Sequence, residues 1–188
     1  MTIPKTYSAK AVANYFLEKG KPEGVALTPM QLIKLVYFAH GWSLAIFDRP
    51  LIDERVQAWR FGPVIPSLYH EFKIFGNQPI TEEATEFTFR PGETFRYIVP
   101  NLPQEDTGRL ALLDKVWEVY SKLPALKLSQ LTHEAGSPWH KAYIENPGIR
   151  GGTINDDALK DYFNHLATGS KITLDGIQGR EEIGGSPR

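Results

Sequence analysis

The side chains best suited to catalysis or metal binding in this chain are its five histidines, His40, His70, His133, His140 and His165. None lies in an H-E-x-x-H motif, and the sequence contains no G-x-S-x-G elbow, P-loop or G-x-G-x-x-G fingerprint. His133 and His140 flank a Gly-Ser-Pro break beside Glu134, so these three side chains could converge on a metal ion. Closed zinc sites need three or four ligands at tight spacing, however, which favours histidines that hydrogen-bond around a turn.

His40 is followed by Gly41 within the most apolar segment of the chain. A hydrogen bond to a backbone carbonyl explains a buried imidazole there better than general-base catalysis does. Four pairs of adjacent carboxylates are predicted to lie on the surface: Asp53/Glu54, Glu82/Glu83, Asp156/Asp157 and Glu181/Glu182. The sequence therefore predicts no catalytic residue set, no metal site and no cofactor.

The amino-acid composition excludes further classes of site and partner. The chain has no cysteine, which excludes disulfides, thiolate nucleophiles and thiolate metal sites and fits a reducing compartment. Its net charge is −1, and lysine and arginine are scattered, so nucleic acid is not expected as a partner of this chain alone. The N-terminus lacks the pattern of a secretory signal, and the apolar stretch from Leu32 to Phe47 is interrupted by Lys34, His40 and Ser43. We expect a cytoplasmic protein without a membrane segment.

Helical signals dominate the sequence. Ser8 and Gly20 are predicted to bound a first helix, and Thr28-Pro29 with Gln31 forms a capping box that starts a helix running to about Phe47. That second helix is apolar over most of its circumference, so we expect it to be central and buried. Further helices are predicted near residues 68–75, 106–123 and 129–135, after Ser137, and after Asn155.

Two segments are predicted to be extended. Residues 87–90 and 95–99 alternate in polarity around Pro91-Gly92, which indicates a β-hairpin. Residues 56–61 are a short extended piece, followed by a rigid connector, Gly62-Pro63-Val64-Ile65-Pro66. The prediction is one mainly α (α+β) domain over residues 1–168, built around a buried central helix with a small antiparallel β-hairpin. Residues 169–188 are expected to form a mobile, Gly-rich tail.

The aromatic residues offer a candidate binding surface. Most rings are expected to form the core, but a stiffened connector beside Trp59-Arg60-Phe61 would lose little entropy on binding. Tryptophan, tyrosine and arginine are also enriched at interface hot spots. The predicted partner-binding residues are Trp59, Arg60, Phe61, Pro63, Tyr69 and Trp139.

Several motifs together resemble a known family. The segments 32–42 (LIKLVYFAHGW), 49–51 (RPL) and 58–69 (AWRFGPVIPSLY) resemble the Panacea domain, also called the SocA-like or GepA-like phage-associated domain. Residues 116–120, 128–134 and 138–139 are similar to its second half, and residues 154–163 to its closing helix. The resemblance covers roughly residues 8–166. The segment Asp48-Arg49-Pro50-Leu51 departs from the family, which usually has a glycine before the Pro-Leu, and this bears only on the type of turn.

The resemblance implies an antitoxin that binds and neutralises a cognate toxin, and in some members an adaptor that hands the toxin to a cellular protease. It implies no catalytic residues and does not identify the toxin. Two alternatives stay open at this point: a metal-dependent hydrolase using His40, His133 and His140, and a DNA-binding autoregulator. Stoichiometric metal in the purified protein would favour the first, and a salt-dependent shift of its own upstream DNA would favour the second.

Overall fold

The computed structural model describes residues 6–89, 94–146 and 151–169. In these residues helices predominate and two antiparallel strand pairs accompany them, which confirms the predicted mainly α (α+β) class. The elements are α1 (Ala9–Glu23), α2 (Pro29–Phe47), β1 (Gln57–Trp59), β2 (Gly62–Val64), α3 (Pro66–Phe72), η1 (Lys73–Phe75), β3 (Glu86–Thr88), β4 (Arg96–Ile98), α4 (Thr107–Tyr120), α5 (Ala125–Thr132), α6 (Pro138–His140), η2 (Lys141–Glu145) and α7 (Asp156–Gly169). The tail predicted beyond Gly169 and the Pro91-Gly92 turn lie outside the described residues.

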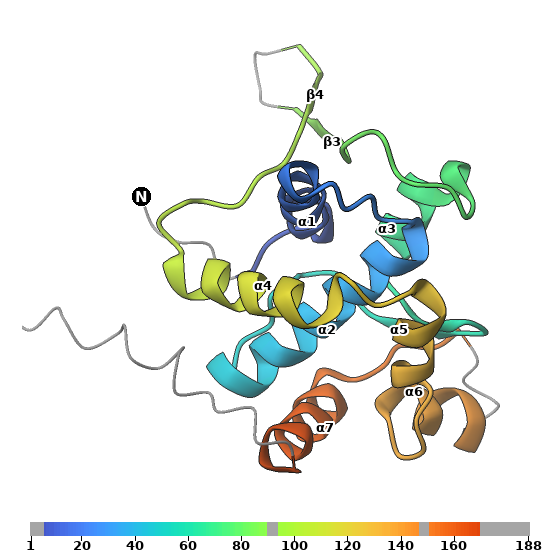
Figure 1. Cartoon of the computed structure of the whole chain (residues 1–188). Coiled ribbons are helices and arrows are strands. Elements are labelled where there is room, and N and C mark those ends of the chain that lie inside the picture. Colours follow the sequence, from blue (N-terminus) through green and yellow to red (C-terminus); the bar gives the residue numbers. More distant parts are fainter. Residues whose placement is uncertain (1–5, 90–93, 147–150, 170–188) are drawn as a thin grey trace, which may run out of the picture.

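Helix α2 is the central helix, as predicted. Thr28 and Gln31 form both hydrogen bonds of the capping box, which fixes the start of the helix at Pro29. The helix contacts α1, α3, α4, α5, α7 and β2, and it runs through the middle of the molecule (Figure 1). By length and apolar composition α2 could cross a membrane, but 72% of its most apolar 18-residue window is buried inside the fold. Helix α2 is therefore a core helix of this fold.

Helices α2 and α7 pack against each other in the core. Phe163 of α7 lies with its ring centroid 5.1 Å from that of Trp42 and 6.0 Å from that of Tyr37. Gly41 makes this approach possible, because a Cβ at this position would lie 2.1 Å from a ring carbon of Phe163. The glycine after His40 in the sequence therefore serves helix packing.

Some predicted boundaries were wrong. Helix α1 continues through Gly20 to Glu23 and ends at Gly24, which has a φ of 67°. Gly20 is needed for close packing instead, because a Cβ there would lie 2.4 Å from the carbonyl oxygen of Val25. Helix α5 begins at Ala125, four residues before the predicted start at Ser129, after Pro124 as its N-cap.

One carboxylate predicted to be solvated has a structural role. Both oxygens of Glu54 accept a hydrogen bond from the backbone N–H of Ala9, at 3.0 and 2.9 Å, so this half-buried side chain helps to cap α1. Asp156 and Asp157 lie exposed in the first turn of α7, as predicted.

The segment predicted as a rigid connector is a strand. Residues 57–59 and 62–64 form an antiparallel hairpin, β1–β2, in which Trp59 pairs with Gly62 and Ala58 with Pro63. The backbone of Ala58 bonds instead to Gly152 and Gly151 on its other side, at 2.9 and 2.8 Å. Because Ala58 makes its bonds outward, its partner Pro63 needs no N–H, and a proline is tolerated in the strand.

The strand pair β3–β4 confirms that the two segments pair as antiparallel strands, with strand residues 86–88 and 96–98 where the sequence predicts 87–90 and 95–99. Phe87 pairs with Tyr97 and Thr88 with Arg96. The hairpin stands away from the helices beyond α1 (Figure 1). Its rings are therefore turned largely to solvent.

Candidate partner-binding surface

Four of the predicted binding residues form one partly exposed group, here called the turn surface: Trp59, Arg60, Phe61 and Tyr69. Arg60 and Phe61 are the two residues of the β1–β2 turn, and the ring of Phe61 is 64% exposed. The guanidinium of Arg60 lies 5.4 Å from the centroid of the Phe61 ring. Trp59 is half-buried and meets the 39% exposed Tyr69 edge to face, with centroids 4.8 Å apart. The hairpin brings an arginine and three rings together at one place.

Side chains from α2, α5 and α6 donate hydrogen bonds to carbonyl groups of the hairpin. Lys34 of α2 donates to the carbonyl oxygens of Phe61 and Pro63, at 3.1 and 2.9 Å. The hydroxyl of Ser129 on α5 donates to the same Phe61 oxygen at 3.4 Å, and the indole of Trp139 donates to the Trp59 oxygen at 2.7 Å. The carbonyls of alternate residues therefore point into the body.

The other two predicted residues lie beneath the surface. Trp139 is 4% exposed, and its ring stacks on that of Tyr143 with centroids 5.0 Å apart. The centroid of the His133 ring lies 3.8 Å from that of the Trp139 ring. Pro63 is also buried. Trp139 donates to the hairpin from another element, and Pro63 is a buried residue of β2, so in this fold neither side chain is exposed on the turn surface.

The outer edge of β1 is covered by the segment that leads into α7. Besides the bonds at Ala58, the N–H of Ile154 donates to the Val56 oxygen at 2.8 Å, and Gln57 and Thr153 form an antiparallel bridge. In Figure 1 the hairpin is the teal pair of strands beside α5. With one edge paired and the carbonyls of the other bound by side chains, the backbone around the turn has little freedom.

Lys34 was not among the predicted site residues, although it was noted as an interruption of the apolar helix. Its side chain is 1% exposed, and burial lowers the pKa of its amine to about 7. Its hydrogen-bond acceptors at the hairpin are carbonyl oxygens, not carboxylates. A lysine within an otherwise apolar helix is the sequence signal that could have indicated it.

A second exposed aromatic group lies on β3–β4 and is here called the hairpin rings: Phe87, Phe89, Phe95 and Tyr97. Each of these rings is more than half exposed, with Tyr97 at 77%. Phe95 stacks on Phe87 at 4.9 Å between centroids and lies 4.8 Å from Phe89. Sequence alternation predicted the hairpin but not that its aromatic residues would lie on the surface.

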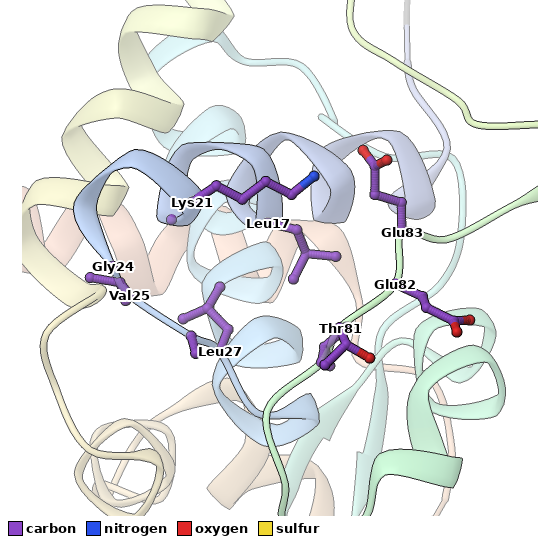
Figure 2. A pocket seen from close by; sticks show the side chains of 11 residues that line it. Leu17, Lys21, Gly24, Val25, Leu27, Thr81, Glu82 and Glu83 are labelled. Atoms are coloured by element: carbon purple, nitrogen blue, oxygen red, sulfur yellow. The ribbon is translucent and has the colours of Figure 1, made fainter.

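A surface pocket of about 400 Å³ lies between the end of α1, the loop to α2 and residues 80–83. Figure 2 shows Leu17 and Leu27 lining it, with the side chain of Lys21 reaching toward Glu83. The charged residues on its rim, Lys21, Glu82 and Glu83, are exposed or half-exposed. Ligand sites usually enclose a few convergent polar groups in an apolar cavity, and this shallow pocket does not have that form.

The three histidines of the hydrolase alternative, His40, His133 and His140, each bond to different residues. The Nδ1 atom of His40 accepts from the backbone N–H groups of Leu51 and Ile52, at 3.3 and 3.5 Å, and its Nε2 atom lies 3.2 Å from the Asp156 carboxylate, so its partners are amides and a carboxylate and not the expected carbonyl. His133 lies against the Ser129 carbonyl, and His140 lies 3.1 Å from Glu145. Within residues 6–89, 94–146 and 151–169, no group of three or more His, Cys, Asp or Glu side chains is arranged to hold a metal ion.

Known proteins resemble this chain in sequence. The family model described as "Antitoxin SocA-like, Panacea domain" matches residues 32–140. A relative named Antitoxin SocA, from Caulobacter vibrioides (strain NA1000 / CB15N), is 31% identical over 163 residues, which are 85% of this chain and 84% of the relative. No solved structure matches the chain. The matched range includes α2 from residue 32 onward and both strands of β1–β2. With the Caulobacter relative, it shows that this chain belongs to the antitoxin SocA-like, Panacea domain family.

Proposed function

We propose that this chain is an antitoxin that neutralises a toxin protein by binding it directly through the turn surface. The family and the name of the Caulobacter relative support the antitoxin role. The observation that carries the choice of surface is the exposed Arg60-Phe61 turn, in and beside which the carbonyls of Trp59, Phe61 and Pro63 accept hydrogen bonds from the buried side chains of Lys34 and Trp139.

The physical case for this surface is its order before binding. A flexible loop loses conformational entropy when a partner fixes it, and a turn already held by three side chains loses little. Arginine, tyrosine and tryptophan are also the residue types that contribute most to interface hot spots. The turn surface presents such residues on a scaffold anchored to α2, α5 and α6.

The test is co-expression with the product of the reading frame adjacent to the gene for this chain, as the candidate toxin. Wild-type chain is expected to restore growth of a bacterial host that expresses this product, and to purify with it. The double variant Arg60→Ala/Phe61→Ala, which replaces exposed side chains and leaves the bonded carbonyls in place, is expected to fold and to lose both properties. Growth restored to the wild-type level by that folded variant would refute the choice of surface.

The hairpin rings provide the matched control. The double variant Phe87→Ala/Tyr97→Ala also removes exposed aromatic surface, and it is expected to restore growth like the wild type. If only this variant failed, the binding site would lie on β3–β4.

The same experiment separates two modes of neutralisation. Sequestration leaves the amount of toxin unchanged and places it in a stable complex with this chain. Delivery to a cellular protease lowers the amount of toxin when this chain is present. We favour sequestration, because the turn surface is preordered in a way that suits a lasting complex.

A further inference from the structure

Lys34 places a buried amine directly behind the exposed turn residue Phe61. Its side chain is 1% exposed, and its Nζ atom lies 3.1 Å from the Phe61 oxygen and 2.9 Å from the Pro63 oxygen. Pro63 is paired with Ala58 at a position where the two do not bond to each other, so the Pro63 carbonyl points to the edge of β2 away from β1, and the carbonyl of the turn residue Phe61 faces the same amine. Lys34 therefore binds the edge of β2 that β1 does not pair.

Gly62 leaves the space that the amine of Lys34 occupies. Gly62 lies between the two bonded carbonyls with a φ of 105°, a conformation that residues with a side chain rarely adopt. A Cβ at Gly62 would lie 2.5 Å from Lys34 Nζ and 3.0 Å from Thr132 Oγ1. The glycine thus permits both the turn and the close approach of the lysine.

We infer that Lys34 is a positioning residue for toxin binding: by fixing the Phe61 and Pro63 carbonyls inward, it sets the direction in which the Arg60 and Phe61 side chains meet the partner. This inference rests on the proposed function, because it concerns the same surface. Lys34 itself does not contact the toxin, since it is closed off from solvent by the hairpin and α2.

Global stability gives no reason for a lysine here. Burying an ammonium group costs free energy, and replacing buried ionic groups by apolar residues of similar volume is often neutral or stabilising. Methionine would fill nearly the same volume without a charge or a donor. What the lysine provides, and methionine cannot, is a pair of charge-assisted hydrogen bonds to the turn.

The first test is the variant Lys34→Met, compared with Lys115→Met, which removes a 44% exposed lysine side chain from α4. Backbone order parameters are measured for Arg60, Phe61 and Gly62, together with the dissociation constant for the candidate toxin. In Lys34→Met the order parameters are expected to fall from ~0.85 to below ~0.6, and affinity to weaken at least ~10-fold, with no loss of thermal stability. Lys115→Met is expected to match the wild type in every measurement.

Two results would overturn the inference. One is an unchanged, rigid turn in folded Lys34→Met. The other is a mobile turn that binds the toxin with wild-type affinity, which would show that the position of the turn does not matter for binding.

A second measurement needs no variant of Lys34 and applies even if Lys34→Met does not fold. The side-chain carbons of Lys34 are followed by NMR as pH rises through 7, where burial places the pKa of this amine. The amide signals of Arg60, Phe61 and Gly62 are expected to shift with the same midpoint, because a neutral amine forms weaker hydrogen bonds to the carbonyls. Amide signals of the turn that show no change at this midpoint would contradict the inference.

His133 requires a control, because histidines titrate in the same pH range. It stands beside this site, with Nδ1 3.4 Å from the hydroxyls of Ser129 and Thr132. In His133→Gln the midpoint at the turn is expected to persist, and its loss would assign the titration to His133 instead of Lys34. If the wild type does not bind the candidate toxin, the proposed function fails, while the order parameters and the titration still decide whether Lys34 holds the turn.

Discussion

Lys34 and Phe61 stand at the two ends of one hydrogen bond, Nζ to carbonyl oxygen at 3.1 Å, although the lysine is 1% exposed and the phenylalanine 64% exposed. The backbone of Phe61 faces the interior and its ring faces solvent. The core helix of the fold is thereby connected directly to the most exposed ring of the turn surface. The predictions below follow from this arrangement and from the packing that supports it.

The stability of the protein is expected to rise with pH above neutrality because of Lys34. Burial lowers the pKa of this amine from 10.5 to about 7, so between these values the unfolded chain binds a proton that the folded chain lacks. The free energy of unfolding then increases with pH, by at most ~1.4 kcal/mol per pH unit from this group. Urea unfolding at several pH values from 6 to 9.5 measures this change in the free energy of unfolding.

In Lys34→Met this contribution disappears. The slope above pH 7 is expected to be shallower than that of the wild type, and at pH 6 the variant is expected to be at least as stable. Equal slopes in the two proteins would show that the amine is not buried as the structure places it.

Gly41→Ala is expected to destabilise the fold by disturbing the contact between α2 and α7. The added methyl group would lie 2.1 Å from the ring of Phe163, and overpacking of this kind typically costs ~1–3 kcal/mol. Gly108→Ala on α4 is the matched control, because its nearest neighbour is a Phe47 carbon at 3.9 Å. The control is expected to be neutral or to gain up to ~1 kcal/mol of helix propensity. Thermal unfolding distinguishes the two, and equal melting temperatures would contradict the packing.

Trp139→Phe is expected to weaken toxin binding although Trp139 is buried. The variant loses the indole N–H that donates to the Trp59 carbonyl at 2.7 Å, and the loss of such a hydrogen bond costs ~0.5–1.5 kcal/mol. Trp117→Phe is the control: its indole donates to the exposed carboxylate of Glu23 at 3.0 Å, which water can satisfy. Titration calorimetry is expected to show a loss of ~10-fold or more in affinity for Trp139→Phe only. An equal loss of affinity in both variants would show that Trp139 affects binding only as one residue of the core, and not through its bond to Trp59.

Local signals made part of this fold predictable. The start of α2 depends on Thr28, Pro29 and Gln31, which are neighbours in the sequence and form the capping box among themselves. The alternation of residues 87–90 and 95–99 likewise needs only the hairpin itself. Features whose partners are adjacent in the chain can be inferred from the chain alone.

The β1–β2 hairpin could not be predicted in this way. Pro63 argues against a strand, and it is tolerated because Ala58, its partner, bonds to residues 151 and 152, far away in the sequence. The same holds for the candidate site. Sequence composition indicated Trp59, Arg60, Phe61 and Tyr69, but it could not separate them from Trp139 and Pro63, which the fold buries.

The most direct test of the account is the dissociation constant of the toxin complex for Phe61→Ala, compared with the wild type and with Phe87→Ala. If the turn surface is the binding site, removal of the Phe61 ring is expected to cost ~2 kcal/mol or more, about 30-fold in affinity, while Phe87→Ala binds like the wild type. A folded Phe61→Ala variant that binds the toxin within about twofold of the wild type would contradict the account.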